Sequence, residues 1–166
     1  SGPGHVHLIN GLYDAQRSGA PVLAIASTLP THEFGTEYFQ ETNTIKLFED
    51  CSYYNQVATT PEQFPRMLQG AIQAALSFRG VGVIGLPDLT SKTATSGESS
   101  QQPFPTKQRV CPSAEEIDAL ADLLNKAEKV TIFCGIGAKD AHKELVELSL
   151  RLNAPVAYSF KSKMEI

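Results

Sequence analysis

A glycine-containing turn between a strand and a helix is the feature of this sequence best suited to hold a ligand. In TIFCGIGAKDAHKELVEL, residues 131–148, an apolar strand leads into Gly135 and Gly137 and then into an amphipathic helix. Glycine lets the backbone approach a ligand closely, and the free N–H groups of a helix N-terminus favour an anion such as pyrophosphate. The segment has the form of a dinucleotide site, although turn glycines of an ordinary strand–helix unit follow the same pattern.

This glycine pattern departs from that of NAD sites in two ways. Asp140 occupies the third glycine position of G-x-G-x-x-G. The next strand ends in SFKSKMEI, where Lys161 and Lys163 stand in place of the acidic residue that binds the ribose hydroxyls of NAD. Because a basic strand end suits phosphate better than ribose, the sequence argues against NAD and leaves NADP or a flavin dinucleotide open.

A second candidate ligand loop opens the chain. The stretch SGPGHVHLING places Gly2, Pro3 and Gly4 before a helix that contains His7. Such a loop could hold polar groups of a ligand near the helix N-terminus, or it could be an ordinary helix entry. A histidine that faces a cleft can transfer a proton near neutral pH, but a lone histidine is more often a packed or surface residue.

Aromatic, amide and acidic side chains come together in EYFQET, residues 37–42. Loops carry binding and catalytic residues disproportionately, although Phe39 could fill the core and Gln40 could cap a turn. No metal site is expected: His32 and Glu33 have no further partner at ligand spacing, and histidines two positions apart in a helix, such as His5 and His7, do not face the same way.

The bulk composition excludes several classes of protein. Hydrophobic residues make up 42% and charged residues 19%, and a net charge of -4 without a basic block argues against a nucleic-acid partner. The three cysteines show no C-x-x-C spacing, which fits a reducing cytoplasm. The longest apolar runs have the length of strands, and no signal peptide opens the chain, so we expect a cytoplasmic protein without a transmembrane helix.

Apolar strands alternate with amphipathic helices on both sides of a polar stretch. Capping boxes at Thr60–Gln63 and Ser113–Glu116 mark two of the helix starts. The alternation predicts an α/β fold made of two partial three-layer, parallel-sheet (Rossmann-like) segments. Helices are expected at 5–19, 45–48, 60–78, 113–129 and 141–152, and strands at 21–27, 53–59, 80–87, 130–134 and 155–160.

Residues 88–112 are rich in Ser, Thr, Gln and Pro and are predicted to form an exposed linker. The expected domains are therefore 1–87 and 113–166. Because the second segment shows only two strands, we expect the chain to be a fragment. Its open sheet edges and apolar faces predict marginal stability or self-association.

Taken together and in order, four stretches resemble the thiamine-diphosphate-dependent pyruvate oxidases, which include the bacterial quinone-linked pyruvate dehydrogenases. The resemblance covers nearly the whole chain except the linker. Acetolactate synthases share the Gly-Pro-Gly loop and a Phe-Gln-Glu element, but HLINGL with His7 points to the oxidases. The stretches are GPGHVHLINGLYDAQRSGAPVLAIAS, FQET, PEQFPRMLQGAIQAALSFRGVGVIGLP and CGIGAKDAHKELVELSLRLNAPV.

The resemblance implies three α/β domains, which hold the aminopyrimidine of thiamine diphosphate, FAD, and the diphosphate with Mg²⁺. This chain would carry the later part of the first domain, residues 1–87, and the opening part of the central one, residues 113–166. The glutamate that activates the aminopyrimidine precedes the Gly-Pro-Gly loop in the family, and the Mg²⁺ motif is absent from this sequence. We therefore expect the fragment to be inactive alone.

The resemblance also assigns roles by position. It implies that His7 lines the pyruvate site and that Phe39 and Gln40 pack against the thiamine ring and hydrogen-bond intermediates. Lys161 departs from some relatives, which have proline there. The cofactor-binding positions are Gly2, Pro3 and Gly4 for thiamine diphosphate, and Gly135, Gly137, Ala138, Ser159 and Lys163 for FAD.

The function implied for the full-length parent is decarboxylation of pyruvate with electron transfer to FAD, then to oxygen or a quinone, giving acetate or acetyl phosphate. The family's thiamine site lies between subunits, which implies a dimer or tetramer. In the quinone branch, membrane contact comes from a C-terminal tail outside this sequence. Two alternatives remain: an acetolactate synthase with structural FAD, and a non-catalytic nucleotide-binding module.

Overall fold

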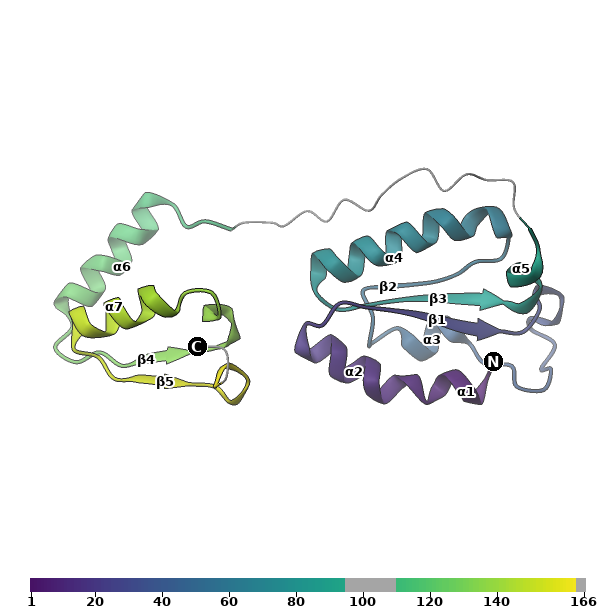
Figure 1. The fold of residues 1–166 in the computed structure, drawn as a ribbon, viewed down its shortest axis with the longest axis horizontal. Helices are drawn as coiled ribbons and strands as arrows, with labels where there is room; N and C mark the ends of the chain where they lie inside the picture. Colours follow the sequence, from purple (N-terminus) through teal and green to yellow (C-terminus); the bar gives the residue numbers. More distant parts are fainter. Residues whose placement is uncertain (95–109, 164–166) are drawn as a thin grey trace. The chain divides into compact units, whose positions relative to one another are not determined.

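Two separate units make up the chain, residues 1–108 and 109–166. The structure is a computed structural model that describes residues 1–94 and 110–163 (Figure 1). Each unit has its own parallel sheet and its own helices. The predicted α/β fold with parallel sheets is confirmed.

The first unit is built on a three-stranded parallel sheet in the order β1-β3-β2. Val22 of β1 pairs with Val81 of β3, and Tyr54 of β2 pairs with Gly82. Because all three strands run in the same direction, their carboxyl ends meet at one edge of the sheet. The strand bounds are Val22–Thr28 for β1, Tyr54–Val57 for β2 and Val81–Pro87 for β3.

Helices cover both faces of this sheet (Figure 1). On one face, α2 (Leu8–Ser18) and α3 (Thr44–Phe48) enclose a core of Leu12, Ala24, Ala26, Phe48, Cys51, Val81 and Val83. On the other face, α4 (Phe64–Phe78) encloses Ala58, Ala71 and Ile84. The three layers expected from the alternating pattern are therefore present in the first unit.

The helix starts and stops follow local chemistry. Pro3 is the first residue of α1 (Pro3–Val6), and Gly19 ends α2 in the left-handed conformation, with φ 67°. Before α4, the short 3₁₀ helix η2 (Pro61–Gln63) carries the expected capping box, in which the Gln63 side chain accepts the backbone N–H of Thr60 at 3.3 Å.

The stretch expected to be a linker begins with a short helix, α5 (Asp88–Lys92), which contacts β3. Its Thr90 is buried, and the Thr90 hydroxyl donates a hydrogen bond to the carbonyl of Thr59 at 3.3 Å. This single turn is too short to produce a helical periodicity in the sequence. The rest of the predicted linker falls partly in residues 95–109, outside the described residues.

The second unit has a two-stranded parallel sheet of β4 (Ile132–Cys134) and β5 (Val156–Tyr158), with Cys134 paired to Tyr158. Its helices are α6 (Ala114–Lys126) and α7 (His142–Leu152). The Ser113–Glu116 capping box forms as expected, with the Ser113 N–H 2.8 Å from the Glu116 carboxylate. Among residues 1–94 and 110–163, no helix has both the length and the apolar composition needed to cross a bilayer.

The close packing of α4 on the central strand generates a stability prediction. A Cβ added at Gly82 would lie 2.6 Å from the backbone carbonyl oxygen of Ala71, whereas one added at Gly11, inside α2, meets open space. We expect Gly82→Ala to lower the free energy of unfolding by about 1–3 kcal/mol through overpacking. The matched Gly11→Ala should be neutral or raise it by up to about 1 kcal/mol.

Denaturant unfolding of the purified variants, followed by circular dichroism, measures both values. Equal effects of the two substitutions would show that α4 does not approach β3 this closely.

Candidate functional site

The loop between β1 and α3 meets the start of the chain at the carboxyl edge of the first sheet. Gly2 is buried just before α1, with φ 53° and ψ -120°. A Cβ at Gly2 would collide with the carbonyl oxygen of Gln40 and come within 2.8 Å of the Gln40 Cβ. Two residues predicted to belong to the site from separate parts of the sequence are thus in direct contact.

Gln40 has an unusual backbone conformation. Its φ is 68°, in the left-handed region, and Glu37 in the same loop has φ 57°. For residues other than glycine, such conformations cost about 1–3 kcal/mol each and persist only where the surroundings enforce them. The side chains of Gln40 and of its neighbour Phe39 are exposed, Phe39 at 80%. The loop therefore presents an amide and an aromatic ring outward on a constrained backbone.

The remaining residues predicted near the start of the chain lie on α1 and at its end. Pro3 and Gly4 are exposed, and a Cβ added at Gly4 meets open space. His7 is an exposed residue at the junction of α1 and α2. The expectation that His7 lines the pyruvate site remains a prediction.

His5 is a site residue that the sequence analysis did not identify. It is only 6% exposed, and both ring nitrogens are used: Nδ1 lies 2.9 Å from the carbonyl oxygen of Ser27, and Nε2 lies 2.7 Å from the hydroxyl of Thr42. Its ring also contacts that of Phe48, with 5.7 Å between centroids. The alternation of His5 and His7 was the only sequence signal, because the bonding partners lie 22 and 37 residues away.

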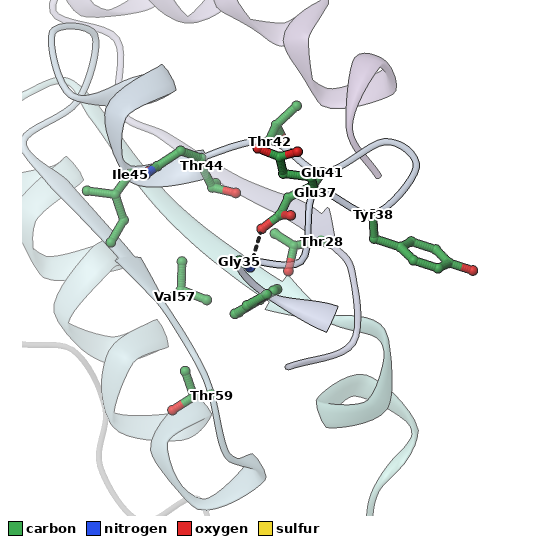
Figure 2. A pocket seen from close by; sticks show the side chains of 12 residues that line it. Thr28, Gly35, Glu37, Tyr38, Glu41, Thr42, Thr44, Ile45, Val57 and Thr59 are labelled. Atoms are coloured by element: carbon green, nitrogen blue, oxygen red, sulfur yellow. Dashed lines mark hydrogen bonds between the residues drawn. The ribbon is translucent and has the colours of Figure 1, made fainter. Parts of the chain in front are cut away.

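A pocket of about 900 Å³ opens under the same loop (Figure 2). Within the loop, the N–H of Gly35 donates to the Glu41 carboxylate at 2.6 Å (Figure 2). His7, Phe39 and Gln40 do not line it. The lining residues are Thr28, Phe34, Gly35, Glu37, Tyr38, Glu41, Thr42, Asn43, Thr44, Ile45, Val57 and Thr59.

The polar groups of this pocket are hydroxyls, an amide and two carboxylates, with no lysine or arginine in the lining. Carboxylates oppose the binding of an anion in their vicinity and favour hydrogen-bond donors. The lining of this pocket therefore suits groups that donate hydrogen bonds better than anions.

In the second unit, the glycine turn forms the 3₁₀ helix η3 (Ile136–Ala138), and α7 begins after it at His142. The amide of Ala138 donates to the carbonyl of Gly135 at 3.1 Å, so it is used within the turn. Cβ atoms added at Gly135 or Gly137 would meet open space. The backbone at both glycines is therefore accessible, and the expectation that they bind FAD remains a prediction.

The end of β5 is joined to the end of β4 by serine hydrogen bonds. The N–H of Ser159 donates to the carbonyl of Cys134 at 2.9 Å, and the Ser159 and Ser162 hydroxyl oxygens are 3.0 Å apart. The hydroxyl of Ser162, which is fully buried, also lies 3.0 Å from the Cys134 carbonyl. These bonds place η4 (Phe160–Ser162) against η3 and bring exposed Lys163 to the same corner as the glycine turn.

Among the described residues, no group of three or more His, Cys, Asp or Glu side chains is arranged to hold a metal ion. The thiol of Cys51 is 1% exposed, and burial raises its pKa. Cys111, in contrast, is exposed.

Comparison with known proteins places the two units in one family. The family profile "Thiamine pyrophosphate enzyme, N-terminal TPP binding domain" matches residues 1–47, and "Thiamine pyrophosphate enzyme, central domain" matches residues 117–166.

Three relatives each align with 98% of this chain. They are an uncharacterized 42.6 kDa protein in the isoamylase 3' region of Pseudomonas amyloderamosa (45% identical), the putative thiamine pyrophosphate-containing protein YdaP of Bacillus subtilis (37%) and the pyruvate oxidase of Lactiplantibacillus plantarum (33%). Acetolactate synthases are similar at lower identity, 29% for the yeast mitochondrial catalytic subunit. The chain spans 41%, 29% and 28% of the lengths of the first three relatives.

The contact between Gly2 and Gln40 predicts the effect of two matched substitutions. In Gly2→Ala, the methyl group must displace the Gln40 backbone, and alanine disfavours the positive φ. We expect a loss of stability of about 1–3 kcal/mol and faster hydrogen exchange in residues 34–43. At Gly4, two residues away, an added methyl group meets open space, so Gly4→Ala should lower neither the stability nor the exchange protection of residues 34–43. Faster hydrogen exchange in both variants would contradict the contact between Gly2 and Gln40.

The two cysteine environments predict different reactivity. The thiolate is the reactive form, and burial both shields Cys51 and raises the pKa of its thiol. At pH 8 we expect Cys111 to react with a thiol reagent more than about tenfold faster than Cys51. Mass spectrometry of the labelled peptides measures both rates, and rapid labelling of Cys51 in the folded protein would be inconsistent with its buried position.

Proposed function

Because this chain belongs to the thiamine pyrophosphate enzymes, we propose that it is part of a pyruvate oxidase that uses thiamine diphosphate and FAD to decarboxylate and oxidise pyruvate. The similarity to the pyruvate oxidase of L. plantarum over 98% of the chain supports the proposed reaction. The single structural observation that carries the proposal is the close contact of Gly2 with Gln40, which unites the Gly-Pro-Gly loop with the Phe-Gln pair.

The residues at the outer side of this loop suit a ring-shaped cofactor and a small ketoacid. Phe39 offers an exposed aromatic face against which a ring can pack, and Gln40 offers a hydrogen-bonding amide on a constrained backbone. His7 and Gln40 would hydrogen-bond the substrate carboxylate or carbonyl oxygen, which requires donors at fixed positions. Bound thiamine diphosphate supplies the carbanion chemistry that allows CO₂ to leave, and FAD accepts two electrons.

The corner of the second unit suits a phosphate-containing cofactor such as FAD. The open backbone at Gly135 and Gly137 allows close approach, and Lys163 places a cation beside it. The amide of Ala138 and the hydroxyl of Ser159 are already engaged within the protein. Their contribution would therefore be to hold the two turns in place rather than to donate directly to the cofactor.

We assign the whole protein's remaining properties by the same family likeness. Its partners would be pyruvate and further copies of the chain in a dimer or tetramer, with Mg²⁺ held outside residues 1–166. The electron acceptor would be oxygen or a quinone, the latter through peripheral membrane contact, and the compartment would be the cytoplasm. Sedimentation of the complete protein with and without lipid vesicles measures its self-association and its membrane contact.

The decisive experiment uses the complete protein. We expect a yellow flavin absorption spectrum and turnover of pyruvate that depends on added thiamine diphosphate. His7→Ala should lower kcat/KM for pyruvate by about 10-fold to 100-fold, as expected for loss of a hydrogen bond to a charged group. His32→Ala is the control, because the exposed His32 lies in η1 (Thr31–Glu33), where its Nε2 is 3.6 Å from the neighbouring Glu33 carboxylate. An unchanged kcat/KM in His7→Ala would remove His7 from the site.

Acetolactate synthase is the second candidate, favoured by the 29% identity to the yeast enzyme over 94% of this chain. In that reaction a second ketoacid is the acceptor and FAD is structural. Quantifying acetolactate against acetate and acetyl phosphate from pyruvate separates the two functions. Acetolactate as the main product would overturn the oxidase assignment and keep the thiamine-dependent one.

A further inference from the structure

The ring of His5 connects three segments that are distant in the sequence. It projects from α1, contacts the carboxyl end of β1 through Ser27, and contacts the loop before α3 through Thr42. The carbonyl oxygen of Ser27 can only accept, so Nδ1 carries the hydrogen. In the neutral ring, Nε2 is then the acceptor and the Thr42 hydroxyl donates to it.

The position of this ring is fixed by the core. His5 is 6% exposed, and its ring packs at 58° against Phe48, which is completely buried in the cluster between α2, α3 and the sheet. A buried ring with both nitrogens hydrogen-bonded has no low-energy alternative orientation, because rotation would leave polar groups unsatisfied. The hydrogen bond to Thr42 therefore ties the loop to the packed core.

Thr42, which is hydrogen-bonded to His5, lies two residues after Gln40, the loop residue with the left-handed backbone conformation. Gln40 holds a φ of 68°, Gly2 packs against its backbone, and Thr42 is bonded to His5. Residues 2 and 5 of the chain thus contact residues 40 and 42 of the loop. Two such contacts supply the external constraint that a non-glycine residue in the left-handed region requires.

We propose that His5 is a positioning residue, whose bonds to Ser27 and Thr42 hold the backbone of Gln40 so that its side chain faces the substrate. The proposal rests on the proposed function to the extent that Gln40 contacts the reacting groups. His5 itself is buried behind the loop and acts only through Thr42 and Gln40.

The test compares matched variants in the complete protein. Thr42→Val keeps the shape of the side chain but removes the hydroxyl, Thr42→Ser keeps the hydroxyl, and His5→Phe keeps an aromatic ring against Phe48. We expect Thr42→Val and His5→Phe to lower kcat about tenfold with KM for pyruvate changed less than about threefold, because the loss is one of orientation. Thr42→Ser should restore kcat to within about threefold of wild type.

The double variant His5→Phe/Thr42→Val should be no slower than the slower single variant, since both substitutions break the same bond. The proposal would be overturned if the losses of kcat in His5→Phe and Thr42→Val added in the double variant, or if Thr42→Val and Thr42→Ser lowered kcat equally.

Hydrogen exchange gives a readout that does not depend on activity. Peptides covering residues 34–43 should exchange faster in His5→Phe and Thr42→Val but not in Thr42→Ser, while peptides from α4 stay protected. Faster exchange in the loop with unchanged kcat would refute the positioning role. If the wild-type protein shows no thiamine-dependent turnover, the proposed function is refuted, and with it the link from His5 to the substrate. If hydrogen exchange of the loop is unchanged in the variants, only the positioning role of the His5–Thr42 hydrogen bond is refuted.

Discussion

The central strand β3 is the element on which the first unit depends. Its neighbours β1 and β2 pair with its two edges, and helices cover both of its faces. Val81 and Val83 belong to the core under α2 and α3, and Ile84 belongs to the core under α4. A parallel strand buried on both faces must be apolar or small throughout, and VGVIGLP meets that requirement, with Gly82 at the closest approach of α4.

Because β3 fixes β1 and β2 in parallel, the segments that follow these strands are brought to one edge of the sheet. The loop after β1 carries Phe39 and Gln40, and residues Val57 and Thr59 at the end of β2 line the pocket beneath it. The start of α1 reaches the same edge through Gly2. The site is therefore assembled from three chain segments whose meeting point is set by strand pairing rather than by local sequence.

The second unit is held together differently. No residue of α6 or α7 is buried, and Cys134, Ala154 and Ser162 are among its few buried groups. The glycine turn and the basic turn after β5 are joined by hydrogen bonds from Ser159 and Ser162 to the end of β4. A buried serine that satisfies two neighbouring backbone segments can fix their geometry where little apolar surface is buried.

The sequence by itself determined the order and type of the main elements, because the apolar periodicity, the capping boxes and the stop at Gly19 are local signals. Through the family resemblance it also pointed to Gly2 and Gln40, which the structure brings into contact, and to the thiamine pyrophosphate enzymes, whose profiles match residues 1–47 and 117–166.

Only the tertiary structure decided four other features. They are the contacts of His5, the positive φ of Gln40, the helix α5, and the hydrogen bond of the Ser162 hydroxyl to the Cys134 carbonyl. Each depends on a partner that strand pairing or chain folding brings close from elsewhere in the sequence, or on one short turn. Periodicity cannot report such contacts, because a hydrogen bond between residues 5 and 42 leaves no pattern in either segment alone.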